Sequence, residues 1–144
     1  MSRRGLIDSL STLVQVRTSE VERMEADLAR QEATRRRYQT SVERLTALAE
    51  GSGASGRLAP ALALNCGQYK EAVFALADSH RVDLQLHEAN MAASQRTLAA
   101  AWTRRELLGK VLEQHQDSFA REQDRAARKR EDDIATQAWM AGQE

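Results

Sequence analysis

The chain has 144 residues, equal numbers of basic and acidic side chains, and only 4% aromatic residues. Ala, Glu, Lys, Leu and Arg together make up about half of it, which is typical of long helices and coiled coils. This composition argues against a β-sandwich or barrel and against a doubly wound nucleotide-binding fold, and the zero net charge argues against non-specific nucleic-acid binding. No apolar run approaches the length of a membrane span, so we expect a cytoplasmic protein.

The first predicted element is a long helix over residues 6–50 with a heptad pattern. Steps of three and four from Ile7 reach thirteen positions, ten of them apolar or aromatic. The thirteen are Ile7, Leu10, Val14, Arg17, Val21, Met24, Leu28, Gln31, Arg35, Tyr38, Val42, Leu45 and Ala49. Six heptads predict a coiled-coil helix of roughly 65 Å, which is too long for a compact bundle.

A turn is predicted over residues 51–61, because three of the seven glycines lie between Gly51 and Gly56 and Pro60 is the only proline. A second helix is predicted over residues 62–140. Its seam begins with Tyr69, Val73, Leu76 and His80. One four-residue step where three is due, a stutter, then leads to Leu84, His87, Met91, Ser94, Leu98, Ala101, Arg105, Leu108 and Leu112.

The two seams predict an antiparallel hairpin, because facing residues in such a pair have numbers with a near-constant sum. A sum of 111 pairs Gln31 with His80, Arg35 with Leu76, Tyr38 with Val73 and Val42 with Tyr69, and Leu28 faces Leu84 at 112. Half of 111 falls inside the glycine-rich turn. The expected fold is therefore all-α, a single coiled-coil domain over residues 1–144 in which the C-terminal helix overhangs.

The overhang follows from that register, because Leu6, where the first helix begins, would lie opposite Arg105. Roughly 35 residues of the second helix would then lack an intramolecular partner. The unpaired part carries an apolar stripe of Leu107, Leu108, Val111, Leu112 and Phe119. Such a stripe is a candidate partner surface. Self-association and a solvated tail are the alternatives.

No motif for catalysis is present: the sequence has no Walker loop, zinc-protease motif, nucleophile elbow or cysteine pair. We therefore expect no enzyme activity and no cofactor. Cys66 is interpreted as a small packed hydrophobe. His80, Asp83 and His87 share a helix face and could bind zinc, but polar residues that set the register are the favoured interpretation, so no metal site is predicted.

Two basic clusters, Arg35–Arg37 and residues 121–130, have the residue types of nucleic-acid patches. Acidic residues flank the second cluster at helical spacing, which is usual for a solvated helix. We expect no nucleic-acid partner, and an RNA-binding adaptor is kept as a weaker alternative.

Three stretches of the chain together resemble the flagellar FliJ family and its injectisome counterparts. They are the heptad helix with Gln31, Tyr38 and Arg44-Leu45, the segment from Asn65 to Leu76, and the charged segment from Phe119 to Asp133. The resemblance covers nearly the whole chain. It implies a central stalk of the protein-export apparatus that binds the hexameric export ATPase, the export gate (a membrane protein) and export chaperones.

The resemblance also implies site residues. Export-gate binding would fall on Gln31, Arg35, Tyr38, Val42, Tyr69, Val73, Leu76 and His80. ATPase binding would use the two chain ends, with apolar contacts from Leu6, Leu10, Leu107, Leu108, Leu112 and Phe119 and basic contacts from Arg121, Arg125 and Arg128. The protein would be cytoplasmic and peripheral to the inner membrane through its partners only. The alternative function is a homo-oligomeric coiled-coil scaffold.

Overall fold

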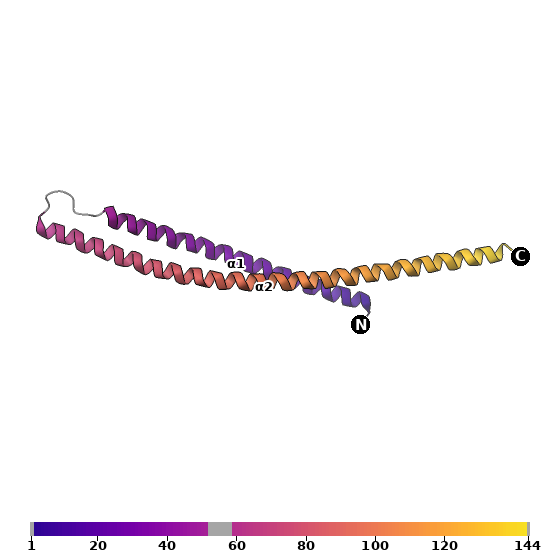
Figure 1. The fold of residues 1–144 in the computed structure, drawn as a ribbon. Coiled ribbons are helices and arrows are strands. Elements are labelled where there is room, and N and C mark those ends of the chain that lie inside the picture. Colours follow the sequence, from indigo (N-terminus) through magenta and orange to yellow (C-terminus); the bar gives the residue numbers. More distant parts are fainter. Residues whose placement is uncertain (1, 52–58, 144) are drawn as a thin grey trace. The chain divides into compact units, whose positions relative to one another are not determined.

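Two long helices make up the fold. The computed structural model describes residues 2–51 and 59–143, and within them the secondary structure is α1, Arg3–Gly51, followed by α2, Pro60–Ala141 (Figure 1). The expected all-α fold of two long helices that pack against each other is confirmed. Most of the predicted turn, residues 52–58, lies outside the described residues.

The helix ends follow from local chemistry. At the start of α1, the Ser2 hydroxyl accepts a hydrogen bond from the Gly5 backbone amide at 3.1 Å, which is an N-cap. α2 begins at Pro60, whose missing N–H is not needed in a first helical turn. After α2, the Gly142 amide donates to the Ala138 carbonyl at 3.1 Å and closes the last turn.

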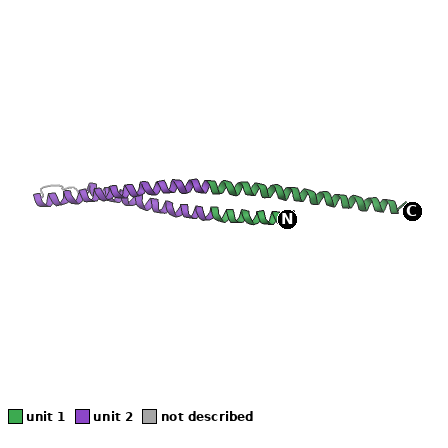
Figure 2. Ribbon diagram, turned by 90° about the horizontal axis from the view of Figure 1, so that it is seen from below, with its two compact units in different colours: residues 1–21, 100–144 green, residues 22–99 purple. Residues whose placement is uncertain are grey.

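The chain divides into two compact units, and each contains a piece of both helices (Figure 2). Unit 1 consists of Met1–Val21 and Ala100–Glu144, and unit 2 of Glu22–Ala99. Each unit is described by itself below.

The heptad seam of α1 is confirmed. All thirteen predicted positions are buried or half-buried, with Val21 in unit 1 only 1% exposed and Ala49 in unit 2 fully buried. The polar members Arg17, Gln31 and Arg35 are half-buried with the rest. Regular three-and-four spacing is therefore a sufficient guide to the inward face of this helix.

The predicted stutter in α2 is wrong. The inward positions of α2 run in regular steps of three and four from Ala63 to Phe119, and they pass through Ala77, which is fully buried, instead of Leu76. Tyr69 and Leu76 are 48% and 49% exposed. The prediction preferred large apolar residues to alanine as seam members, although alanine allows two helices to approach closely.

The predicted register is also wrong. In unit 2, the Gln31 side-chain amide donates to the Ser94 hydroxyl at 3.2 Å, and the Tyr38 ring lies 5.8 Å from the His87 ring. The residue numbers of both pairs add up to 125. Gln31 therefore faces Ser94, whereas the predicted partner was His80, fourteen residues earlier in α2. In unit 1, Arg3 forms an ion pair with Glu122, again with a sum of 125. The pairing is antiparallel as expected, but slipped by two heptads, a change that keeps the same residues on the inward face.

This register shortens the overhang. Within unit 1, α2 runs past the start of α1 only after Glu122, not from about Arg105 as predicted (Figure 2). Leu108, Leu112 and Phe119 are half-buried as a result. Within unit 2, a sum of 125 brings Gly51, the last residue of α1, level with Phe74. The first turns of α2 therefore extend beyond α1.

We predict that Met91→Ala lowers the free energy of unfolding by about 2 kcal/mol or more, because Met91 is 6% exposed in the seam. Leu86→Ala is the matched control on the same helix, since Leu86 is 63% exposed and should change stability by no more than about 0.5 kcal/mol. Urea denaturation followed by circular dichroism measures both. Equal effects of the two substitutions would contradict the assigned seam.

Candidate partner-binding surfaces

A polar layer occupies the centre of unit 2. The Gln31 side chain donates to Ser94, and its backbone carbonyl lies 2.8 Å from Nε2 of His87, which must carry a proton to donate to it. The Tyr38 ring is tilted by 50° against the His87 ring. Two of the predicted gate residues, Gln31 and Tyr38, are therefore engaged inside the hairpin.

Arg35, another predicted gate residue, is satisfied within α1. Its guanidinium donates to both carboxylate oxygens of Glu32, at 2.8 and 2.9 Å, and to the Gln39 amide oxygen at 2.8 Å. The hydrogen bond from Arg35 is the main reason that the pKa of Glu32 falls from 4.5 to about 2, and Glu32 in turn raises the pKa of Arg35. A charged residue at this seam position is thus neutralised by its own helix.

The other predicted gate residues differ in accessibility. Val73 is only 8% exposed, and Val42 and His80 are half-buried. Val42 lines one shallow groove with Leu84, about two heptads beyond the predicted contact at Tyr69. The register therefore does not bring the α1 and α2 members of the predicted gate set together in four facing pairs.

An apolar patch does remain on α2. Leu62, Tyr69 and Leu76 lie seven residues apart, which places them on one face of the helix, and they are 50%, 48% and 49% exposed. We call these three residues the Tyr69 patch. No charged residue lies between Pro60 and Tyr69, so this end of α2 is uncharged.

The predicted ATPase-binding residues lie in unit 1, in two environments. Leu6, Leu10, Leu108, Leu112 and Phe119 are half-buried along the seam. Leu107 is 59% exposed, and Arg121, Arg125 and Arg128 are exposed. The first group is hairpin core as much as surface, and the second group is free to meet a partner.

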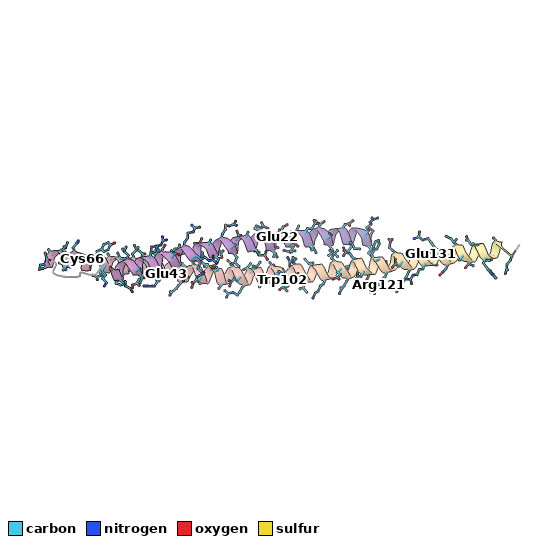
Figure 3. All side chains as sticks on the ribbon, turned by 90° about the horizontal axis from the view of Figure 1, so that it is seen from above. Glu22, Glu43, Cys66, Trp102, Arg121 and Glu131 are labelled. Atoms are coloured by element: carbon cyan, nitrogen blue, oxygen red, sulfur yellow. The ribbon has the colours of Figure 1, made fainter. Side chains whose placement is uncertain are left out.

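The C-terminal extension, residues 123–141 of α2, is exposed at every position. It holds three large apolar side chains, Ile134, Trp139 and Met140, which are 66%, 66% and 60% exposed. Figure 3 labels Glu131 on this length of α2. The extension is about 28 Å of single helix.

Trp102 in unit 1 was not singled out from the sequence. It is 48% exposed, and the Arg105 guanidinium lies 5.7 Å from its ring centre in a cation–π contact. Its position next to the seam residue Ala101 is the signal that would have placed it at the surface.

The candidate zinc ligands His80, Asp83 and His87 do not form a metal-binding cluster. His87 faces the Gln31 carbonyl, Asp83 is exposed, and within the described residues no group of three or more His, Cys, Asp or Glu side chains is placed to hold a metal ion. Cys66 is a half-buried free cysteine. In the same part of the chain, neither helix has a stretch apolar enough to span a membrane.

The family model described as "Flagellar FliJ protein" matches residues 7–144, nearly the whole chain. The chain belongs to the flagellar FliJ family. Membership makes it a component of the flagellar protein-export apparatus, and the family is non-enzymatic. No curated protein and no solved structure matches the chain.

We predict that the ion pair of Glu32 stabilises this FliJ-family chain only above acidic pH. Because folding lowers the pKa of Glu32 to about 2, its contribution is complete above pH 4.5 and is lost as the pH falls toward 2. Glu32→Gln should therefore lower the urea midpoint at pH 6 but not at pH 2, with a smaller difference in high salt.

The matched control for this experiment is Glu22→Gln, which changes an exposed glutamate of the same helix. It should leave the pH dependence of the urea midpoint as in the parent chain. If Glu32→Gln and Glu22→Gln gave the same pH profile, the Arg35 interaction would not be stabilising.

Proposed function

We propose that this FliJ-family chain is the central stalk of the export ATPase. It would bind the hexameric ATPase ring through its termini, promote ring assembly and ATP hydrolysis, and link the ring to the export gate and export chaperones. The observation that carries the proposal is the C-terminal extension, in which α2 continues past its ion pair with Arg3 with every side chain exposed. In this proposal the protein is peripheral to the inner membrane and is held there by its partners alone.

The extension has the form that a ring-inserted element needs. A single helix is only about 10–12 Å across, so it can enter a channel that a helix pair could not. Ile134, Trp139 and Met140 provide apolar contact area that the chain itself does not bury. Arg121 lies just before the extension, and Arg125 and Arg128 lie near its start. These three arginines would pair with acidic surfaces of the ring.

Promotion of ring assembly would follow from the coupling between stalk binding and hexamer formation. If the extension binds the hexamer more tightly than the free ATPase subunit, its binding free energy shifts the equilibrium toward the hexamer. One asymmetric helix also meets each of six subunits differently, which is what a rotary or sequential mechanism requires.

The Tyr69 patch supports the proposed gate contact. Two of its three residues, Tyr69 and Leu76, belong to the predicted gate set and are about half exposed. Gln31, Arg35 and Tyr38 already make contacts within the hairpin. We therefore centre the gate contact on α2, at Tyr69 and Leu76. Export chaperones are proposed as partners from family membership, without an assigned site.

We predict that Ile134→Ala combined with Trp139→Ala reduces the stimulation of the cognate ATPase about tenfold or more, because exposed aromatic and aliphatic anchors dominate such contacts. ATP hydrolysis and hexamer formation are measured with the purified full-length chain. Val82→Ala combined with Leu86→Ala is the control, since both residues are exposed apolar residues of unit 2.

The outcome that contradicts the stalk proposal is equal stimulation by the two double variants and the parent chain. Sedimentation at low concentration tests the scaffold alternative at the same time. A persistent dimer that Ile134→Ala with Trp139→Ala dissolves would mean that the extension pairs with a second copy.

We predict that Tyr69→Ala combined with Leu76→Ala weakens binding of the cytoplasmic part of the export gate about tenfold. Both residues are about half exposed, so helicity and the unfolding midpoint should change little. Titration calorimetry measures the affinity, again with Val82→Ala and Leu86→Ala as the control pair. Unchanged affinity in the Tyr69 and Leu76 variant would remove the Tyr69 patch from the gate interface.

A further inference from the structure

The seam of unit 2 contains little that fixes one register against another. Its buried hydrophobic residues are Ala49, Val73, Ala77 and Met91, two of them alanine. Because the heptad pattern repeats every seven residues, a slip by whole heptads keeps the same residues on the inward face of each helix. Polar contacts at seam positions then decide which register is populated.

The observed register is held by a short set of polar contacts in unit 2. These are the hydrogen bonds from Gln31 to Ser94, from His87 to the Gln31 carbonyl, and from Arg81 to the Thr46 hydroxyl at 3.0 Å. The Arg81 and Thr46 pair is at the rim of the seam, with Arg81 also bound to Asp78. All of these contacts are hydrogen bonds between polar groups.

Two buried polar atoms of the same seam are left without a hydrogen-bond partner: Oε1 of Gln31 and Nδ1 of His80. Buried polar atoms without a partner are uncommon and call for an explanation. A slip of fourteen residues would bring these two residues together, because their numbers add up to 111 and those of Gln31 and Ser94 to 125. The Nδ1–H tautomer of His80 could then donate to Oε1 of Gln31.

The slipped register keeps the seam intact elsewhere in unit 2. Tyr38 would meet Val73 in place of His87, and Leu28 would meet Leu84 in place of Leu98, with which it now lines one groove. Each of these residues already lies on the inward face of its helix.

The two ends of the hairpin would change in opposite senses. In unit 2, Gly51 would come level with Pro60, so α1 would run beside the first turns of α2 that now extend beyond it. In unit 1, Arg3 would leave Glu122 for the level of Leu108, and Leu112 and Phe119 would become exposed. Covering one end therefore uncovers the other.

We propose that the hairpin is a two-register device, in which α1 slides along α2 by two heptads, about 21 Å, between the observed register and one that pairs Gln31 with His80. A ligand that binds one end preferentially in one register shifts the equilibrium and changes the surface offered at the other end. The proposal concerns the free chain and does not depend on the identity of any partner.

Disulfide trapping in the full-length chain, in a Cys66→Ser background and a glutathione buffer, tests the proposal. Leu84→Cys with Val42→Cys reports the observed register, because these residues line one groove. Leu84→Cys with Leu28→Cys reports the slipped register, since the two positions are otherwise about 21 Å apart and cannot be bridged. Intramolecular cross-links in both pairs are expected.

The control pair is Leu84→Cys with Ala49→Cys. In the observed register Ala49 is about seven residues, roughly 10 Å, from the level of Leu84, so local fluctuation would bridge this pair more readily than the Leu28 pair. More cross-linking of the Leu28 pair than of the Ala49 pair supports a discrete slip. Less cross-linking of the Leu28 pair than of the Ala49 pair overturns it.

Spin labels at the exposed positions Thr40 and Leu86 provide a second measurement that leaves the seam unchanged. Two separations are expected, the second about 10 Å longer, because an axial slip of about 21 Å adds at a right angle to the lateral distance between the labels. Ser94→Ala should increase the longer-distance population several-fold by removing the Gln31 acceptor, and His80→Leu should abolish it. A single short separation in all three chains would overturn the two-register proposal.

Discussion

The narrow seam between α1 and α2 holds the two helices together. In proteins most helical stability comes from packing of the apolar face rather than from helix propensity. Among the described residues, the buried ones are few and mostly small: Val21, Ala49, Val73, Ala77, Met91 and Ala101. Stability therefore comes from many modest contacts spread along the seam, supplemented by ion pairs within single helices such as that of Arg35 with Glu32. This leaves most of the surface, and all of residues 123–141, free for partners.

The inward face of α1, and that of α2 from His80 onward, could be predicted from the sequence, but the alignment of one helix on the other could not. The thirteen seam positions of α1 follow from spacing alone, because a heptad pattern defines which face is apolar. The same pattern repeats every seven residues, so it is equally consistent with registers that differ by seven or fourteen. The choice depends on contacts such as Gln31 with Ser94, and polar side chains at seam positions carry no pairing signal in one sequence.

The error in register also explains which candidate sites were misplaced. A sum of 111 left Leu108, Leu112 and Phe119 without a partner, whereas α1 in fact reaches Glu122 and half-buries them. The separate error of the stutter put Tyr69 and Leu76 in the core, where the structure uses Ala77 and leaves both exposed. The corrected register thus moves the free apolar residues to the Tyr69 patch and to the far end of α2. Family membership places this chain in the flagellar export apparatus, and these two surfaces are where its partners are proposed to bind.

Hydrogen exchange measured on the C-terminal extension shows whether this part of α2 binds the export ATPase. In the free chain the backbone amides of residues 123–141 should exchange far faster than those beside the seam, because nothing packs against this length of helix. Addition of the cognate hexameric ATPase should slow their exchange strongly, while amides near Met91 should change little. Exchange in the extension that stays the same with and without the ATPase would contradict the account.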